Sequence, residues 1–364
     1  MKLTPRLASL IRHQSSSFES TRGKATAVAV LLASAPFALA QTNGTWNVNL
    51  NGNWSSAGSW LGSSITDGIG ATADFSQLDI TTNRTATIDT TSRTLGTLLF
   101  GDSTGPTFSN HTIAASGGGT LTFNNNSLGA AITQGANTGA NTISAPVLLA
   151  DNLGLSNNSV SLLTVSGTIS ASTGGTKTIT NNGSGSGGVV FSGIIGNGSG
   201  SVAIVQSSAT SAMTLRGANT FNTGVFVKQG TLIATSSVDG ISTALGSGTL
   251  LLGDTSGSAA ATFAMSSSSA VSYSNPITVQ AGTTGKLTIT RSGNSAAARP
   301  NGNILLNNDL TLEVSGSNRA GSNAGSFLAT GGVISGTGNL NLEVNGGLYT
   351  SNNTGAPQGD SLNV

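Results

Sequence analysis

A match to a hydrolase motif is the first feature of this 364-residue chain whose residue types and spacing suggest chemistry. The residues GDSTG at 101–105 fit G-x-S-x-G, in which the serine stands on a sharp turn between a strand and a helix. A strand-like run precedes Ser103, but a proline and a polar stretch follow it instead of a helix. The segment Leu95–Gly105 also recurs as Ser247–Gly257, in which Thr255 takes the place of Ser103. A segment that is used twice with an altered nucleophile is typical of a structural turn, and we do not expect a hydrolase here.

Two glutamates form the pattern that comes closest to an enzyme site. Glu313 and Glu343 are the only glutamates after residue 40, and each ends the same L-x-L-E frame. If their strands stacked in adjacent coils of a solenoid, the carboxylates would lie about 5 Å apart, which is the separation in retaining glycosidases. Strand alternation also permits a simpler interpretation, in which both side chains lie on a repeated solvent-facing surface. We expect the solvent-facing surface, and their 30-residue spacing fits one coil or two.

Three tryptophans near the start of the expected mature chain permit two interpretations. Trp46, Trp54 and Trp60 are the only tryptophans in the sequence. They are either the hydrophobic cap of the first coil or the stacking platforms of a carbohydrate-binding module. We assign this segment to an N-terminal cap, because the exposed end coil of a stacked sheet needs cover.

Neither a cofactor nor a metal ion is indicated by the remaining motifs. Gly183–Gly188 fits the dinucleotide fingerprint G-x-G-x-x-G, but a strand-like run follows where that fingerprint requires a helix. The chain has no cysteine, and His111, which we expect in a solvated turn, is the only histidine after residue 40. Residues 41–364 carry 9 basic and 12 acidic side chains, a net charge of −3, because five of the 14 basic residues precede residue 41. Such a chain offers no basic surface for nucleic acid, and we expect no nucleic-acid partner.

Composition and pattern predict an all-β chain. Glycine accounts for 51 residues, charged residues for 7% and aromatic residues for 4%, and no helical period is visible after residue 45. Short runs of β-branched and aliphatic residues are instead bounded by Gly, Asn, Ser or Asp, as strands are bounded by turns. The expected strands include Thr97–Phe100, Thr120–Phe123, Pro146–Leu149, Gly188–Phe191, Val225–Val227, Thr249–Leu252, Lys286–Thr290 and Thr311–Val314.

Internal repeats favour a β-helix among the all-β folds. Besides the copy of Leu95–Gly105, several degenerate echoes occur at irregular spacing. Pro146–Leu155 is echoed by Pro276–Ile289 and by Asn303–Val314, and Phe191–Val205 is echoed by Gly331–Val344. Irregular spacing fits a β-helix, in which loops vary while strands stay stacked. With about 20–25 residues per coil, the mature chain would form on the order of 13–16 coils spaced about 4.8 Å apart.

The stretch Leu215–Gly253 resembles the autotransporter-associated β-strand repeat, also called the passenger-associated transport repeat. That pattern runs L-x-G-x-N-T-aromatic-x-G, then a strand, then G-T-L, a loop and A-L-G-x-G-x-L. The matching residues are Leu215, Gly217, Asn219, Thr220, Phe221, Gly224, Gly230, Thr231, Leu232, Ala244, Leu245, Gly246, Gly248 and Leu250. Val225 and Phe226 depart from the pattern, since they stand where Thr is usual. The resemblance implies a right-handed parallel β-helix at the cell surface or secreted, and it implies no catalytic activity.

The N-terminal segment 1–40 has the organisation of a secretory signal peptide. Its first part, 1–24, is basic and rich in serine, and 25–37 is an uncharged apolar run. Ala38-Leu39-Ala40 then gives the small-x-small pattern of a cleavage site, which places the cut between Ala40 and Gln41. The apolar run is shorter than the ~20 residues that span a bilayer. We therefore expect export by the general secretory route.

These observations predict an all-β, right-handed parallel β-helix, or β-solenoid, after a signal peptide. The expected divisions are the signal peptide at 1–40, a cap with the first coils at 41–100, and β-helix repeats at 101–364, with 215–253 the clearest repeat. No C-terminal cap is visible, and we expect a chain truncated at its C-terminus. We expect a non-catalytic, passenger-like and adhesive surface or structural protein that needs no cofactor. A β-helical carbohydrate-active enzyme or a carbohydrate-binding protein is the alternative, and the expected partners are the export machinery and surface glycans or other cells.

Overall fold

The computed structural model describes residues 41–102, 108–236, 240–267, 270–291, 297–316 and 331–346. Gln41 is the first of them. The expected signal peptide with Ala40, the serine Ser103 of the first GDxxG turn, and the segment 347–364 lie outside the described residues.

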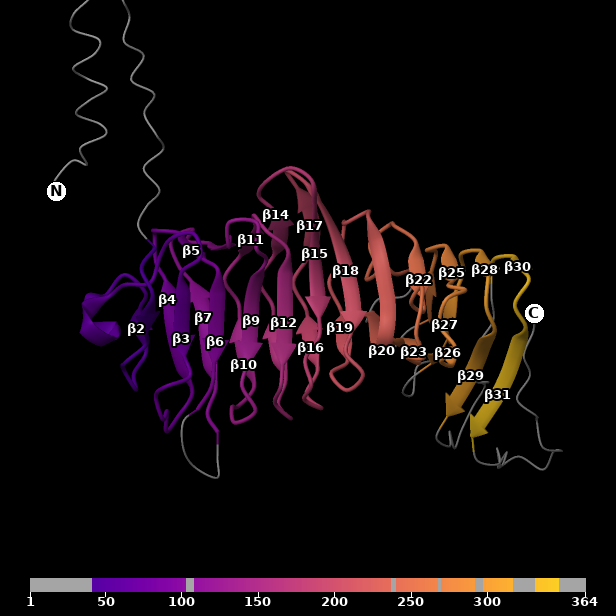
Figure 1. Cartoon of the computed structure of the whole chain (residues 1–364), viewed down its shortest axis with the longest axis horizontal. Coiled ribbons are helices and arrows are strands. Elements are labelled where there is room, and N and C mark those ends of the chain that lie inside the picture. The colour runs from indigo at the N-terminus through magenta and orange to yellow at the C-terminus, as the bar shows by residue number, and fades with distance from the viewer. Residues whose placement is uncertain are drawn as a thin grey trace, which may run out of the picture. The chain divides into compact units, whose positions relative to one another are not determined.

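The described chain is an all-β parallel solenoid, in which successive coils stack strand upon strand. Figure 1 shows the coils following one another from the indigo N-terminal strands to the yellow strands β30 and β31. The strands that pair between successive coils are parallel throughout. Within the described ranges there is no α-helix, only two short 3-10 turns, η1 (Ala57–Ser59) and η2 (Leu61–Ser63). No helix in these ranges has the length and apolar character that a membrane crossing needs.

The coil has three sides, which we call the first, second and third sheets. The first sheet contains β1 (Gly44–Thr45), β3 (Thr72–Phe75), β6 (Thr97–Phe100), β9 (Ala130–Gln134), β12 (Leu153–Asn157), β15 (Thr176–Asn181), β18 (Ser201–Ser207), the start of β20 (Gly224–Ser236), β22 (Leu250–Leu252), β25 (Ile277–Val279), β28 (Ile304–Leu306) and β30 (Ile334–Gly336). The second sheet contains β2 (Gly52–Asn53), β4 (Arg84–Ile88), β7 (His111–Ala115), β10 (Asn141–Ile143), β13 (Leu163–Val165), β16 (Val189–Phe191), β19 (Met213–Leu215), the end of β20, β23 (Ala261–Ser267), β26 (Leu287–Arg291), β29 (Leu310–Gly316) and β31 (Leu340–Gly346).

The third sheet is built in two pieces. One contains β5 (Arg93–Leu95), β8 (Leu121–Phe123), β11 (Val147–Leu149), β14 (Ile169–Ala171) and β17 (Ile195–Gly198), and the other contains β21 (Gly240–Ile241), β24 (Ala270–Tyr273) and β27 (Ala297–Pro300). Because β20 runs through the first and second sheets without a break, their strands join into one 23-stranded sheet.

The coils vary in length more than the sequence predicts. Along the first sheet, Ile204 pairs with the nearby Val225, whereas Leu98 pairs with the more distant Ile132, so that the length of a coil varies widely. The described residues make about 10 turns. The expected length of 20–25 residues fits some coils, such as that from Ile204 to Val225, and is too short for others, such as that from Leu98 to Ile132, because the loops between sheets vary in length. A loop of small polar residues leaves no period in the sequence. The fold class was predicted correctly, while the right-handed twist of the coil stays a prediction.

The core is a single column of inward side chains that runs through the stack. Strand residues alternate between buried and half-buried positions, so that one residue in two faces inward. In the first sheet, Val227, Leu252, Val279 and Leu306 occupy the same register position in four successive coils, and each is at most 4% exposed. Full burial of such a side chain is worth about 1.5–3 kcal/mol. Each inward residue is covered by its counterparts in the coils on either side.

The internal repeats identify strands correctly, but they do not always identify the same side of the coil. The two copies of the GDxxG segment place β6 and β22 in the first sheet. Pro276–Ile289 and Asn303–Val314 likewise place β25 and β28 one above the other in the first sheet. Pro146–Leu155, however, supplies β11 of the third sheet. Since all three sheets use short alternating strands between polar turns, segments on different sides can look alike.

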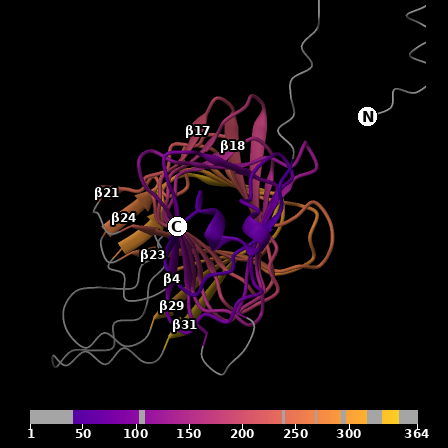
Figure 2. The same ribbon diagram turned by 90° about the vertical axis from the view of Figure 1, so that its left-hand side faces the viewer.

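The N-terminal end of the core is closed by the three tryptophans. Trp46, Trp54 and Trp60 are each at most 2% exposed, and all three indoles pack against Phe75 of β3 at centroid distances of 5.3 to 5.8 Å. Their indole N–H groups donate hydrogen bonds to backbone carbonyls. Figure 2 views the coil from this end and shows the indigo 3-10 turns lying within the ring of strands. The burial leaves the indoles no exposed face on which a sugar could stack.

The last described turn has exposed core positions. Leu312 of β29 is 1% exposed beneath β31, whereas its register partner Leu342 in β31 is 51% exposed. Ile304 is fully buried, while its partner Ile334 is only partly buried. These differences in exposure show how much of the burial of one turn is supplied by the turn that follows it.

Replacing Trp54 by alanine should lower the free energy of unfolding by about 3–5 kcal/mol, because a large buried side chain is lost from the end of the core. Urea unfolding followed by circular dichroism measures the change. Leu50→Ala is the matched control, since Leu50 is 66% exposed in the same segment, and it should change the stability by less than about 0.5 kcal/mol. Equal effects of the two substitutions would contradict the role of the indole in closing the core.

Candidate functional site

The residues of the repeat-like stretch 215–253 join one coil to the next. Leu215, Phe221, Leu232 and Leu245 are buried in the core. Leu232 pairs with Met213 on one side and with Phe263 on the other. Ala244 and Leu250 are buried in the core as well. Among the described residues, this set contains no cluster of reactive groups.

Asn219 links three successive coils through its side-chain amide. Its Oδ1 accepts a hydrogen bond from the backbone N–H of Ile195 at 2.8 Å, and its Nδ2 donates one to the carbonyl of Ala244 at 2.7 Å. Asn219 is 2% exposed, so both bonds are shielded from water. The following Thr220 donates its backbone N–H to the carbonyl of Ile195 at 2.9 Å. The amide is suited to this position because its donor and its acceptor are separate atoms that point in different directions, so that one side chain can reach two coils.

The glycines of the same stretch lie where the backbones of two coils meet. Gly230 has a φ of +70°, and a Cβ there would lie 1.9 Å from the carbonyl oxygen of Ser208. Gly246 has a φ of +61°, and its Cβ would lie 2.2 Å from the carbonyl oxygen of Phe221. A side chain is excluded at both positions by conformation and by space. The other glycines that match the repeat, Gly217, Gly224 and Gly248, also abut the backbone of a neighbouring coil. Thr231 lies on the outward side of β20 in register with Thr262.

The two GDxxG segments follow equivalent strands of the first sheet, and residues 103–105 of the first copy lie outside the described residues. Asp102 follows β6, is 4% exposed and accepts hydrogen bonds from the backbone N–H groups of Ile80 and Ser109. Burial raises the pKa of its carboxyl group. Asp254 follows β22, accepts the N–H of Thr255, which lowers its pKa, and pairs with Lys228. In both copies the aspartate accepts hydrogen bonds from backbone N–H groups.

The two glutamates lie in register, as the glycosidase interpretation required. Glu313 in β29 and Glu343 in β31 are register partners in adjacent coils, so that their 30-residue spacing is one coil. The Nζ of Lys286 lies 2.6 Å from Oε2 of Glu343, and the two side chains are 48% and 40% exposed. Both glutamates lie on the outward side of the second sheet, as strand alternation predicts, since Leu312 between Thr311 and Glu313 is buried. The arrangement offers two carboxylates and an ammonium group on an open surface.

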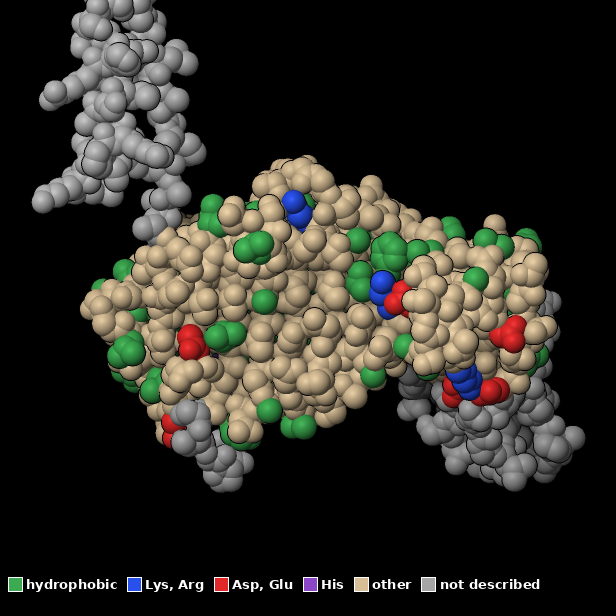
Figure 3. All heavy atoms as spheres, viewed as in Figure 1, with side chains coloured by type: hydrophobic (Ala, Val, Ile, Leu, Met, Phe, Trp, Pro, Cys, Tyr) green, Lys and Arg blue, Asp and Glu red, His purple; other side chains and the backbone are tan. Residues whose placement is uncertain are grey.

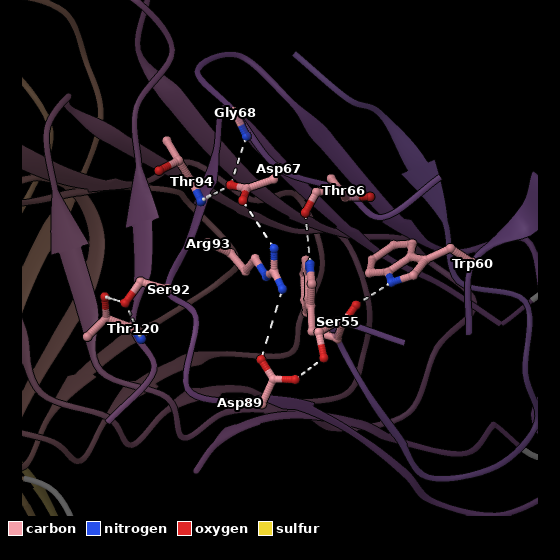
Figure 4. A network of polar contacts seen from close by, with 11 residues as sticks. Ser55, Trp60, Thr66, Asp67, Gly68, Asp89, Ser92, Arg93, Thr94 and Thr120 are labelled. Carbon is pink, nitrogen blue, oxygen red and sulfur yellow. Dashed lines mark hydrogen bonds and ion pairs between the residues drawn. The ribbon is translucent and has the colours of Figure 1, made fainter. Parts of the chain in front are cut away.

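A buried arginine forms an ion-pair network near the N-terminal cap (Figure 4). Arg93, the first residue of β5, is 8% exposed, with Nη1 3.2 Å from Oδ2 of Asp67 and Nη2 3.9 Å from Oδ1 of Asp89. Asp67 also accepts the backbone N–H of Thr94. Asp89 accepts a hydrogen bond from the hydroxyl of Ser55, which lowers the pKa of the aspartate. The network fastens the segment that carries the tryptophans to the third sheet, and its groups are those of a structural clamp.

The histidine expected in a solvated turn is instead buried in the core. His111 begins β7, is 1% exposed and lies between Phe75 and Phe100, with ring centroids 5.3 Å and 6.4 Å away. Neither ring nitrogen has a hydrogen-bond partner. Burial lowers the pKa of His111 to about 4. The prediction was wrong because His111 falls on an inward position of a strand, where only the neighbouring coils decide what surrounds it.

A buried ladder of amides continues this part of the core. Gln134 donates from Nε2 to Oδ1 of Asn157 at 3.1 Å, and Asn141 donates from Nδ2 to Oε1 of Gln134 at 3.1 Å. Further along, Asn181 donates to Oε1 of Gln206 at 2.9 Å. All five side chains are fully buried. None was predicted from the sequence because amides are typical of turns, although Gln134 and Asn157 follow alternating apolar residues and so occupy inward positions.

The described residues contain no group of three or more His, Cys, Asp or Glu side chains that could hold a metal ion. No known protein family, curated protein or solved structure matches this chain. The fold of the chain is therefore identified from its structure alone. The chain is a parallel β-solenoid.

Lowering the pH from 6.5 to 4 should destabilise the solenoid by up to about 3 kcal/mol through His111. Over this window the unfolded histidine takes up a proton and the folded one does not, because the folded pKa is about 4 against an unfolded value of about 6.5. In His111→Phe, which extends the aromatic stack, this part of the loss should disappear. Urea unfolding at several pH values tests this, and identical pH profiles for the two proteins would contradict it.

Asn219→Ala should cost about 2–4 kcal/mol of stability, because it leaves the N–H of Ile195 and the carbonyl of Ala244 buried without their partner. Asn222→Ala is the matched control from the same turn, since Asn222 is exposed. Thermal unfolding should show a clear loss for the first variant only. If Asn219→Ala unfolded at the wild-type temperature, the amide would not be what joins these coils.

Proposed function

We propose that this protein is a non-catalytic, exported bacterial solenoid that serves at the cell surface as a structural and adhesive rod. It would be a passenger-like protein of the autotransporter-associated β-strand repeat type, with a right-handed coil. The observation that carries the proposal is the role of the residues that match the repeat. Leu215, Asn219, Phe221 and Gly230 make contacts between coils, as the residues of a solenoid repeat should.

The surface of the coil supports an adhesive role. Outward positions of the strands are mainly Thr, Ser and small residues, and the chain as a whole is only 7% charged. Figure 3 shows one side of the described solenoid, on which charged side chains are few and widely spaced. A long surface of this kind suits many weak contacts with uncharged partners, which add up when the contacts are made together.

The leader supports an exported location. Its basic n-region, apolar run and small-x-small site are the three parts of a secretory signal peptide. A chain without cysteine also suits an oxidising compartment, since its core needs no disulfide and contains no thiol to oxidise.

A carbohydrate-active enzyme is the second candidate, and it depends on the register of Glu313 with Glu343. Side chains on adjacent strands lie about 5 Å apart, as the two carboxyl groups of retaining glycosidases do. Against this candidate, the Lys286 ammonium engages Glu343, and all three tryptophans are buried at the other end of the stack. We therefore prefer the non-catalytic function.

Expression of the full chain in a Gram-negative host tests the proposed location. The exported protein should begin at Gln41, as measured by intact mass, and Ala40→Asp should block the cut because signal peptidase requires a small residue there. An uncleaved protein that stays in the cytoplasm would contradict export. Beads coated with the exported protein should then retain bacterial or host cells, and albumin-coated beads should not. Failure of every cell type to bind would contradict adhesion.

The enzyme candidate has a separate test. Under our proposal, the purified protein releases no reducing sugar from a panel of neutral and acidic polysaccharides. Turnover that is lost in both Glu313→Gln and Glu343→Gln, with the fold intact by circular dichroism, would overturn the non-catalytic function. A drop of about 10²-fold or more in rate is expected of a true catalytic carboxylate.

A further inference from the structure

Phe226 stands outside the core although the fold does not require an aromatic residue there. It lies in β20 between Val225 and Val227, which are both fully buried, so that its ring faces outward from the first sheet. The repeat pattern has Thr at this point. Every other aromatic side chain among the described residues is buried except Phe108. Phe226 is therefore the only aromatic residue in the described strands whose ring lies on the outer surface of the solenoid.

The ring is the centre of a short apolar column on the outer surface. Val205 of β18 and Leu251 of β22 are its register partners in the two adjacent coils, and both are half-buried on the outward side. The column continues with Thr180 on one side and Thr278 on the other, so that polar residues bound it at both ends. With strands about 4.8 Å apart, the three apolar side chains span about 10 Å. Figure 3 shows hydrophobic side chains gathered over β18, β20 and β22.

An ion pair adjoins the column. Lys228 is two residues beyond Phe226 in β20, and its Nζ lies 3.4 Å from Oδ1 of Asp254 in the next coil. The two side chains are 41% and 32% exposed, so that they are accessible to a partner. The Lys228 ammonium supplies hydrogen-bond donors and the Asp254 carboxylate supplies acceptors, and their charges cancel. In Figure 3 adjoining blue and red side chains lie beside the apolar patch.

The small size of this apolar column favours a small ligand over a protein as its partner. A stable protein–protein interface buries about 800 Å² on each partner, from 20–30 residues. Three apolar side chains and one ion pair fall far short of this, but they match the contact that one or two sugar rings require. Ligand sites of this size combine an aromatic or apolar surface with a few well-placed polar groups.

We propose that Phe226, Val205 and Leu251, with Lys228 and Asp254, form a binding subsite for the sugar ring of a neutral glycan. The phenyl ring would stack on the apolar face of the sugar, and the ammonium and carboxylate would bond its hydroxyl groups. The inference rests on the proposed adhesive function and names the class of partner and the place where it binds.

Calorimetric titration of the mature protein with cellohexaose, maltohexaose and chitohexaose tests the subsite, with hexagalacturonate as the acidic comparison. At least one neutral hexasaccharide should bind. Phe226→Thr, which restores the residue of the repeat pattern and suits a strand, should weaken that binding about tenfold or more. Phe226→Trp should bind at least as tightly as the wild type, because the larger ring stacks better.

Two matched variants separate stacking from general hydrophobic contact. Phe226→Leu keeps apolar area without a ring, and it should lose affinity as Phe226→Thr does. Leu99→Thr changes an outward leucine of the same sheet far from the patch, and it should bind normally. Binding by Phe226→Leu at the wild-type affinity, an equal loss in Leu99→Thr, a preference for hexagalacturonate, or no binding of any neutral hexasaccharide would each overturn the subsite. A dimer that Phe226→Thr dissociates, detected by light scattering, would instead assign the patch to a second copy.

The outcome is distinguishable from that of the adhesion experiment. If beads carrying Phe226→Thr retained cells as well as the wild type did, this subsite would be wrong and the adhesive function would stand. If neutral glycans bound in a Phe226-dependent manner while wild-type beads retained no cells, the subsite would stand and the adhesive function would be wrong.

Discussion

The structure depends on one constraint, which is that no turn of the coil can bury its own apolar side chains. A turn contributes only a few inward residues, and the turns on either side supply their cover. Leu312 is 1% exposed beneath β31, whereas its counterpart Leu342 in β31 is 51% exposed. Stability is therefore shared between neighbours rather than held in one centre, as in other repeat architectures. At the N-terminal end the same need is met by the packing of Trp46, Trp54 and Trp60 on Phe75.

The same constraint determines which polar groups can enter the core. A buried amide is tolerated only where neighbouring groups satisfy both its donor and its acceptor. Asn219 meets this condition with the backbone of two other coils. Asn181 donates to Gln206 in the next coil and accepts the N–H of Gly183, while Gln206 donates to the carbonyls of Ser208 and Ser211. His111 does not meet it, since both of its ring nitrogens lack a partner. Burial therefore disfavours the protonated form of His111. As a result, the stability of the fold decreases when the pH becomes mildly acidic.

The sequence was sufficient to predict the strands, the all-β class and the solenoid, because alternation and turn residues are local signals. It was not sufficient to predict the length of a coil or the side on which a strand lies. Pro146–Leu155 and Pro276–Ile289 look alike, yet their first strands lie in the third and the first sheet. The spacing of Glu313 and Glu343 could not be resolved into one coil or two for the same reason. The buried position of Gln134 could have been predicted, because it alternates with Ala130 and Ile132 along the strand. It was missed because an amide side chain is more typical of a turn.

Function in such a fold must be sought on the outward positions, since the inward ones are determined by packing. Outward strand positions in a solenoid suit β-branched and aromatic residues, both of which are enriched in strands. Glu313 directly above Glu343 places like charges on neighbouring strands, which is unfavourable, and Lys286 offsets this for Glu343. Phe226 is half-buried on the outer surface, in register with the apolar Val205 and Leu251. This apolar column offers a surface to an uncharged ring, whereas Lys286 already engages Glu343, and for this reason we place the binding surface at Phe226 rather than at the glutamates.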